Sequence, residues 1–501
     1  MATDAAERTG SRIRPIVRMI PLDLAPLQAL SAVEREPHTV FLESLGAVDE
    51  GARWTILAFD PVWRLELRAG TLWRLAGGEA VAQPGRPMEA LARMWPERSD
   101  YDREIAPIPA GVSGGARHLP FVSGLAGYLS YDLKDQLERY PERARRESSL
   151  PDLSLGFYDV VWAWDRASGQ GWVVSTGLSE RDPDSRQGRA KTRLEHQWAR
   201  VLGAAQEAAS SSAPAVRSGQ APSAAAAGRS NFTRDGYRRV VERALEHIAA
   251  GDVYQVNLAQ RFCFTPAPEP ASLFRSLREE SPAPFSAFLT APGTAIASSS
   301  PERFFRIDGN RIETWPIKGT RPRGSTPAED TALTESLRAS AKDRAENVMI
   351  VDLERNDLGR ICEIGSVRVT SLCEVASYAN VHHLVSRVEG RLREDAGPVD
   401  VIRAMFPGGS ITGAPKIRAV DIIDALEPTR RGVYTGAIGY WDVSGACDFN
   451  IAIRTIVVEG GAATFHAGGG IVADSTPEGE YEETLVKARG MMRALGTRWE
   501  A

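Results

Sequence analysis

The chain has few cysteines and no long apolar run, and both absences narrow what it can be. Its 501 residues include only four cysteines, which are scattered and form no close pair with metal-ligand spacing. That usage is typical of free thiols in a reducing compartment, not of a disulfide framework or a zinc site. No apolar run approaches the ~20 residues that a membrane-spanning helix needs. Because segment 1–14 is polar and lacks the apolar core of a signal peptide, we expect a soluble, cytoplasmic protein.

An excess of charge of one sign is also missing. The formal net charge is −5, and no block of Lys and Arg with interleaved aromatic residues occurs. We therefore expect no nucleic-acid partner. A hydrophobic content of 43% and a charged content of 25% are ordinary for a globular enzyme. The length allows two domains or one large elaborated domain.

The order of segments predicts an α+β protein. Short β-type runs fill an N-terminal region over 15–178, separated by Gly, Pro and Asp. A charged helical segment (184–207) and an Ala/Ser/Gly/Pro-rich stretch (208–230) follow, so we interpret 179–230 as a helix and a linker. Strands and helices then mix over 231–498 without regular βαβ alternation, which favours the α+β class.

A lysine stands in an unusual setting at position 318. It follows a β-type segment (311–315) and precedes Gly319-Thr320, so we expect it where a strand end meets a pocket. A lysine amine becomes a nucleophile when apolar walls or nearby cations depress its pKa. The alternative is an ordinary solvated loop cation, which is the commoner environment of lysine.

A glycine run near the C-terminus leads into a charged helix. Three consecutive glycines (468–470) let backbone N–H groups approach an anion. Ser475 and Glu478 have capping-box spacing, and Pro477 fits the first turn. Three side chains then share one helix face: Glu480, Glu483 and Lys487. The alternative is that these acids only complement the helix dipole and that Glu483 and Lys487 form a surface ion pair.

Two further segments carry candidate ligand-binding groups. The glycine-rich turn 407–413 precedes Pro415 and an amphipathic helix, an arrangement suited to a carboxylate or a phosphate, although the spacing is not that of a P-loop. The apolar positions of that helix are Ile417, Val420, Ile422, Ile423 and Leu426. A helix over 342–357 presents Glu346, which together with Glu483 could hold Mg²⁺. His383, next to His382, is either functional or a satisfied structural histidine.

Together these stretches resemble the chorismate-utilising enzymes, a family that includes anthranilate synthase component I and the aminodeoxychorismate, isochorismate and salicylate synthases. The matching segments keep the family's order. They are Gly251–Leu258, Ser300–Phe304, Trp315–Thr320, Asp352–Arg360, His383–Ser386, Gly409–Lys416 and Gly470–Lys487, with a weaker N-terminal match at Gly124–Tyr128. The resemblance implies the large two-subdomain fold of that family, with antiparallel sheets flanked by helices, and a catalytic domain over 231–498.

The resemblance also implies roles for individual residues. Glu346 and Glu483 match the family's Mg²⁺ ligands, with Glu480 in support; the metal would neutralise a carboxylate of chorismate. Lys318 matches a catalytic position, Glu302 a general acid or base, and His383 the histidine beside the leaving C4 hydroxyl. The positions that match substrate-binding residues are Ser410, Tyr434, Arg454, Gly470, Lys487 and Thr320.

Lys318 favours one reaction within the family. Anthranilate synthases carry alanine there, whereas in aminodeoxychorismate synthases a lysine forms a covalent adduct with chorismate. Isochorismate and salicylate synthases use a water-activating lysine where this chain has Gln255. The resemblance thus implies 4-amino-4-deoxychorismate synthesis, on the route to 4-aminobenzoate and folate. We expect ammonia to come from a separate glutamine amidotransferase (glutaminase) subunit, since no cysteine stands in a nucleophile-elbow context.

Two alternatives remain open at this stage. The first is anthranilate synthase component I, with Lys318 as a bystander, and the second is a non-catalytic chorismate- or tryptophan-binding module. Glu43 and Ser44 resemble part of the tryptophan site of feedback-inhibited anthranilate synthases; the alternative, and the commoner case, is a plain edge strand. An intact set of Mg²⁺ carboxylates and a substrate arginine argue against a catalytically silent protein.

Overall fold

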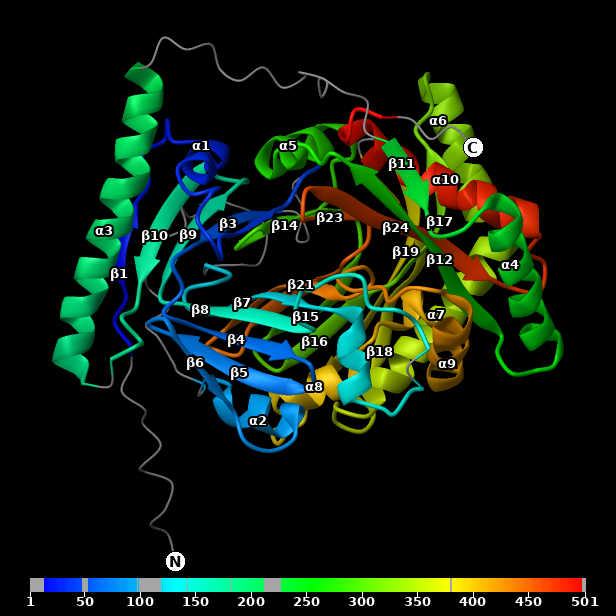
Figure 1. The fold of residues 1–501 in the computed structure, drawn as a ribbon, viewed down its shortest axis with the longest axis horizontal. Coiled ribbons are helices and arrows are strands. Elements are labelled where there is room, and N and C mark those ends of the chain that lie inside the picture. Colours follow the sequence, from blue (N-terminus) through cyan, green and yellow to red (C-terminus); the bar gives the residue numbers. More distant parts are fainter. Residues whose placement is uncertain are drawn as a thin grey trace, which may run out of the picture.

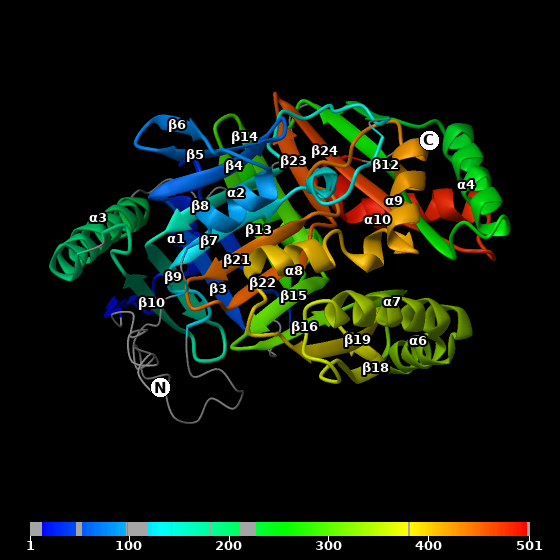
Figure 2. The ribbon, with the colours of Figure 1, turned by 90° about the horizontal axis from the view of Figure 1, so that it is seen from below.

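Two large antiparallel sheets, stacked face to face and covered by helices, form the fold (Figures 1 and 2). The computed structural model describes residues 13–46, 53–96, 98, 119–141, 143–180, 182–210, 227–378 and 381–497. This architecture confirms the expected α+β class. Among the described residues, no helix combines the length and the apolar character needed to cross a membrane.

Sheet one joins strands from both ends of the chain. Its order is β1 (Ile16–Met19), β10 (Gln170–Ser175), β9 (Val160–Asp165), β3 (Trp54–Ala58), β2 (Val40–Glu43), β13 (Phe285–Ala291), β14 (Thr294–Ser300), β23 (Thr455–Glu459), β24 (Ala462–Ile471), β12 (Gln255–Thr265) and β11 (Ala227–Ser230), with β20 (Gly413–Ala414) beside β12. Strand β11 occupies the end of the stretch expected to be a linker, so that expectation is wrong for residues 227–230. Residues 211–226 are not among the described residues.

Sheet two is built in the same mixed way. Its order is β17 (Ile317–Pro322), β19 (Val381–Arg391), β16 (Arg311–Trp315), β15 (Arg303–Asp308), β22 (Cys447–Ile451), β21 (Ala437–Asp442), β7 (Gly124–Leu129), β8 (Leu153–Tyr158), β4 (Trp63–Arg68), β5 (Thr71–Ala76) and β6 (Glu79–Ala82), with β18 (Arg368–Ser377) beside β19. Both regions predicted from the sequence therefore contribute to both sheets. The boundaries at 178 and 230 stay predictions.

Alternating side chains explain the layers. On β2, Val40 packs into the core between the sheets and Phe41 into the core under the helices of sheet one; Ile56 and Leu57 of β3 divide in the same way. Successive side chains of a strand point to opposite faces, so strands with apolar residues at every position are buried on both sides. The result is four layers: helices, sheet one, sheet two and helices.

The helices gather by position. They are α1 (Pro26–Ser31), α2 (Pro87–Met94), α3 (Pro183–Ser210), α4 (Arg234–Ala249), α5 (Pro270–Glu280), α6 (Pro327–Ala339), α7 (Ala341–Gly359), α8 (Pro398–Met405), α9 (Lys416–Leu426) and α10 (Pro477–Ala494). Helix α3 stands at one end of the molecule, whereas α4, α6, α7, α9 and α10 gather at the other (Figures 1 and 2). The predicted apolar stripe of α9 holds except at Ile417, which is 60% exposed.

Candidate active site

Lys318 lies within an edge strand of sheet two. In β17 it stands opposite Leu384 of β19, and after a bulge at Gly319, whose φ is +72°, Thr320 stands opposite His383. The strand runs on to Pro322, so the prediction that Lys318 marks a strand end is wrong. The bulge twists the strand locally, and a positive φ at that position favours glycine.

The Lys318 amine points at the glycine-rich turn. Its Nζ donates to the carbonyl oxygen of Ser410 at 3.1 Å, and Nδ2 of Asn257 donates to the same oxygen at 3.0 Å. Ser410 belongs to the 3₁₀ turn η2 (Gly409–Ile411). Burial lowers the pKa of Lys318, against the opposing charges of Glu346 and Glu302. A lowered pKa increases the fraction of neutral amine, which is the nucleophilic form.

Glu302 lies beside that amine. It is 5% exposed, and burial raises its pKa, while a hydrogen bond from Ser410 and the charge of Lys318 oppose the rise. A carboxyl group whose pKa is raised in a buried site is suited to acid–base chemistry near neutral pH. The structure thus brings Lys318, Glu302 and Ser410 together.

His383 is buried and keeps one ring nitrogen free. Its Nδ1 lies 3.0 Å from Oγ1 of Thr320, while its Nε2 is buried without a hydrogen-bond partner among the described residues. Burial and the charge of Arg454 lower the pKa of His383 to about 3. The ring is therefore neutral, and Nε2 is the atom that a bound ligand could engage.

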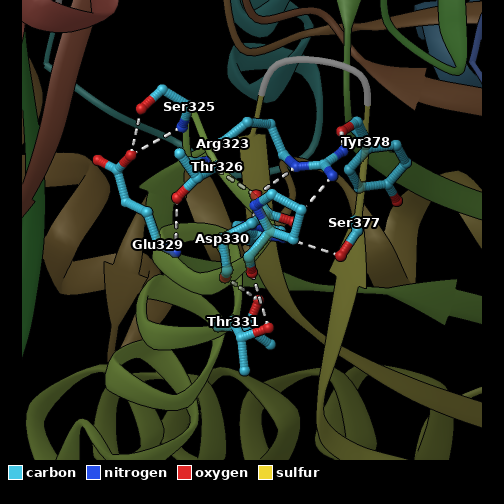
Figure 3. A network of polar contacts seen from close by, with 12 residues as sticks. Arg323, Ser325, Thr326, Glu329, Asp330, Thr331, Ser377 and Tyr378 are labelled. Atoms are coloured by element: carbon cyan, nitrogen blue, oxygen red, sulfur yellow. Dashed lines mark hydrogen bonds and ion pairs between the residues drawn. The ribbon is translucent and has the colours of Figure 1, made fainter.

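A polar network fixes the strand ends next to His383 (Figure 3). Asp330 of α6 accepts two bonds from Arg323, at 2.8 and 2.9 Å, one from the backbone N–H of Gly324 at 2.8 Å, and lies 2.9 Å from Nε2 of His382. Nδ1 of His382 contacts Ser377 of β18 at 2.8 Å. His382 therefore belongs to this structural network and not to the pocket, which supports the structural interpretation for that histidine alone.

Three carboxylates lie near one another: the charges of Glu346 and Glu483 reach Lys318, and the charge of Glu483 reaches Glu480. A Cβ atom placed on Gly469 would lie 2.8 Å from Oε1 of Glu483 and 3.2 Å from Oε2 of Glu480, so both carboxylates meet β24 at this glycine. Nζ of Lys487 donates to Glu483 at 2.7 Å. Burial raises the pKa of Glu483, but Lys487, together with Lys342 and Lys318, outweighs burial and holds that pKa below its usual range. The charge of Glu483 also reaches Glu346.

These carboxylates have the donor chemistry that Mg²⁺ prefers. Among the described residues, Oε2 of Glu480 is buried without a hydrogen-bond partner, while Oε1 accepts from Ser475 at 2.6 Å. No group of three or more His, Cys, Asp and Glu side chains in the described part of the chain is arranged to hold a metal by itself. Mg²⁺ usually takes only one or two carboxylates and fills its octahedron with water and substrate oxygens, so the set still fits.

The start of α10 corrects a local prediction. Thr476 is the N-cap and accepts from the backbone N–H of Gly479 at 3.2 Å, so Ser475 and Glu478 form no capping box. Ser475 is instead used to orient Glu480. Pro477 opens the helix as predicted, and the ion pair of Glu483 with Lys487 exists within the carboxylate group.

Two arginines of the candidate site differ in their partners. Arg431, 3% exposed, donates to Glu427 at 2.7 and 2.9 Å and to the carbonyl oxygens of Ile411 and Asn257, each at 3.0 Å. The half-buried Arg454 has a guanidinium that no described residue pairs with, and burial alone lowers its pKa. Its backbone φ is +50°, a strained value for a non-glycine residue. The unpaired guanidinium suits an anionic ligand.

The remaining predicted positions have other neighbours. Tyr434 stacks on His466, with ring centroids 5.0 Å apart. A Cβ atom on Gly470 would lie 2.7 Å from Nε2 of Gln255, so only the backbone of Gly470 can meet a ligand. Glu43 pairs with Arg278 of α5 at 2.5 Å. The tryptophan site at Glu43 and Ser44 stays a prediction.

Comparisons with known proteins give one family and two activities. Residues 49–493 match the family described as chorismate binding enzyme. Aminodeoxychorismate synthase component 1 of Bacillus subtilis is 36% identical over 487 residues, which are 96% of this chain and 97% of the relative. Anthranilate synthase component 1 of Thermus thermophilus is 38% identical over 491 residues, 97% of this chain and 98% of the relative. The solved structure of anthranilate synthase component I from Streptococcus pneumoniae has a TM-score of 0.73 and 30% identity, covering 93% of this chain and 97% of that one.

Proposed function

Because the chain belongs to the family of chorismate-binding enzymes, we propose that it converts chorismate and ammonia into 4-amino-4-deoxychorismate. One observation carries the choice of reaction: a lysine amine with a lowered pKa points at the Ser410 turn beside Glu302. Overall sequence identity does not distinguish the two reactions, because relatives with either activity are about equally similar to this chain.

In the first step the neutral amine of Lys318 forms a bond to C2 of chorismate. The two ring double bonds shift, the bond between C4 and its hydroxyl breaks, and the hydroxyl takes a proton to leave as water. Glu302, buried, with a raised pKa and close enough for its charge to act on Lys318, is the proposed proton donor. The free Nε2 of His383 would hydrogen-bond the C4 hydroxyl.

In the second step ammonia bonds to C4, the double bonds shift back, and the bond between C2 and Nζ of Lys318 breaks. One difficult substitution becomes two allylic displacements, which is the usual gain of covalent catalysis. Arg454 would pair with a substrate carboxylate, and Glu346 and Glu483 would hold Mg²⁺, with Glu480 in support. The metal, when bound, supplies positive charge that neutralises a substrate carboxylate.

The proposal includes a separate glutaminase subunit as the ammonia source and a cytoplasmic location. The product belongs to 4-aminobenzoate and folate synthesis. Anthranilate formation is the competing outcome, because anthranilate synthases are 38% identical over nearly the whole chain. It would need direct attack of ammonia at C2, with Lys318 as a spectator.

The test is a product assay. Purified protein receives chorismate, Mg²⁺ and an ammonium salt, and the products are separated by chromatography with and without added aminodeoxychorismate lyase. We expect 4-aminobenzoate only when the lyase is present. Anthranilate formed without the lyase would overturn the proposal, and absence of any chorismate turnover would favour a binding module.

A further inference from the structure

A buried acid lies directly beneath the turn that Lys318 contacts. Glu354 of α7 is 3% exposed, and its Oε1 accepts the backbone N–H of Gly409 at 3.3 Å. Its Oε2 is buried and has no hydrogen-bond partner among the described residues. The proposed reaction gives this side chain no role.

The turn rests on α7 without any gap. A Cβ atom placed on Gly409 would lie 2.6 Å from Cδ2 of Leu353 and 3.1 Å from Oε1 of Glu354. Ser410 comes next in the chain, and its carbonyl oxygen holds Nζ of Lys318. A displacement of Glu354 therefore moves the backbone to which the Lys318 amine is bonded.

The charge of Lys416 reaches Glu354 and opposes its neutral state, but no cation is bonded to Glu354 among the described residues. Asp357 lies one turn along the same helix, and Lys416 of α9 is bonded to Asp357 at 2.5 Å and to the carbonyl oxygen of Met405 at 3.0 Å. Glu302, after β14, adds a further negative charge from the pocket side. Burial and the charge of Asp357 raise the pKa of Glu354 to about 8.

We propose that Glu354 is a positioning residue, which as a neutral acid supports the Gly409–Ile411 turn and so places the Lys318 amine. A carboxylate at this position would be a buried charge without a bonded cation, beside Asp357 and Glu302, because Lys416 is bonded to Asp357. The fold would relieve that cost by turning the side chain toward water, and the support of the turn would be lost. The link to Lys318 rests on the proposed function; the neutral state of the acid does not.

The first test measures protonation without using the reaction. Infrared difference spectra of the wild type against Glu354→Gln isolate the carbonyl stretch of a protonated carboxyl group. We expect that band at pH 6.5 and its loss as the pH rises through about 8. Glu335→Gln, at a side chain that is 60% exposed, is the matched control and should give no such band. Absence of the band in the wild-type difference at pH 6.5 would overturn the proposal.

The second test measures the consequence for turnover. Chorismate consumption is followed against pH at constant free ammonia, so that protonation of ammonia itself does not shape the profile. We expect kcat of the wild type to fall several-fold from pH 7.5 to 9, and Glu354→Gln to lose that fall, with an unchanged KM for chorismate. An identical alkaline fall in both proteins would overturn the positioning role. The infrared result stands whichever product forms, so failure of the proposed function is recognised separately.

Discussion

Replacing Arg454 by methionine should separate ligand binding from stability. The Arg454 guanidinium has no protein partner among the described residues, and burial already disfavours its charge. Methionine keeps most of the length of the side chain. The backbone φ of +50° is equally strained for arginine and for methionine, so it adds no difference in stability between the wild type and Arg454→Met. Arg431→Met is the matched comparison, because that arginine contacts Glu427, Ile411 and Asn257.

Arg454→Met should lower kcat/KM without lowering stability, whereas Arg431→Met should lower stability. Loss of hydrogen bonds from a guanidinium to a substrate carboxylate is worth about 1.5–3 kcal/mol, which lowers kcat/KM for chorismate by about 10- to 150-fold. The free energy of unfolding of Arg454→Met should stay equal or rise. Arg431→Met leaves Glu427, which is 4% exposed, as a buried carboxylate without its cation. That change should cost about 3–5 kcal/mol of stability.

Urea unfolding followed by fluorescence, together with steady-state kinetics on the same preparations, measures both quantities. A loss of more than about 1 kcal/mol of stability in Arg454→Met, with kcat/KM unchanged, would refute the assignment of this arginine to the ligand. The double variant Arg431→Met/Glu427→Met tests whether Arg431 stabilises the fold by pairing with Glu427. It should be less destabilised than the sum of the single variants, because no charge stays unpaired.

Three further predictions follow from the site. Chelation of Mg²⁺ should abolish turnover. Glu480→Gln should raise the Mg²⁺ concentration needed for half-maximal rate about tenfold or more. An unchanged metal dependence of this variant in a Mg²⁺ titration would contradict the proposed ligands. Asp330→Asn should lower the thermal midpoint, because Asp330 contacts Arg323, Gly324 and His382. The variant should also lower kcat more than it raises KM. Scanning calorimetry and steady-state kinetics measure these effects. For Glu354, the unfolded chain releases the proton near pH ~4.3 and the folded chain only near pH 8, so wild-type stability falls over that interval and stays level above it. Glu354→Gln should therefore gain about 1 kcal/mol or more on the wild type between pH 5 and 8 in urea unfolding; a constant difference would contradict the raised pKa.

Much of the fold and part of the site were predictable because the signals are local. Periodicity placed the helices of Glu346 and Glu483, and the glycine-rich turn before α9 is marked by its own residues. The strand at 311–315 is observed with the predicted bounds as β16. Lys318 was identified from its neighbours in sequence, and the structure adds the burial that lowers its pKa.

What could not be predicted depends on contacts between distant segments. The carbonyl oxygen of Ser410 unites Lys318 and Asn257, which are 92 and 153 residues away in sequence. In the sequence, nothing distinguishes Glu354 from the other acids of a charged helix. Its burial beneath the Gly409–Ile411 turn is evident only in the structure. The capping error arose because Thr476 and Ser475 are adjacent and both can cap, and only the position of Glu480 determines which one does.

The most direct test of the central claim is the rate of aminodeoxychorismate formation by Lys318→Ala with chorismate, Mg²⁺ and ammonium. Circular dichroism and the thermal midpoint must first show that the variant is folded. The covalent role of Lys318 predicts no detectable 4-aminobenzoate in the assay coupled to the lyase, whereas the wild type accumulates it. Full activity of the folded Lys318→Ala protein would contradict the account.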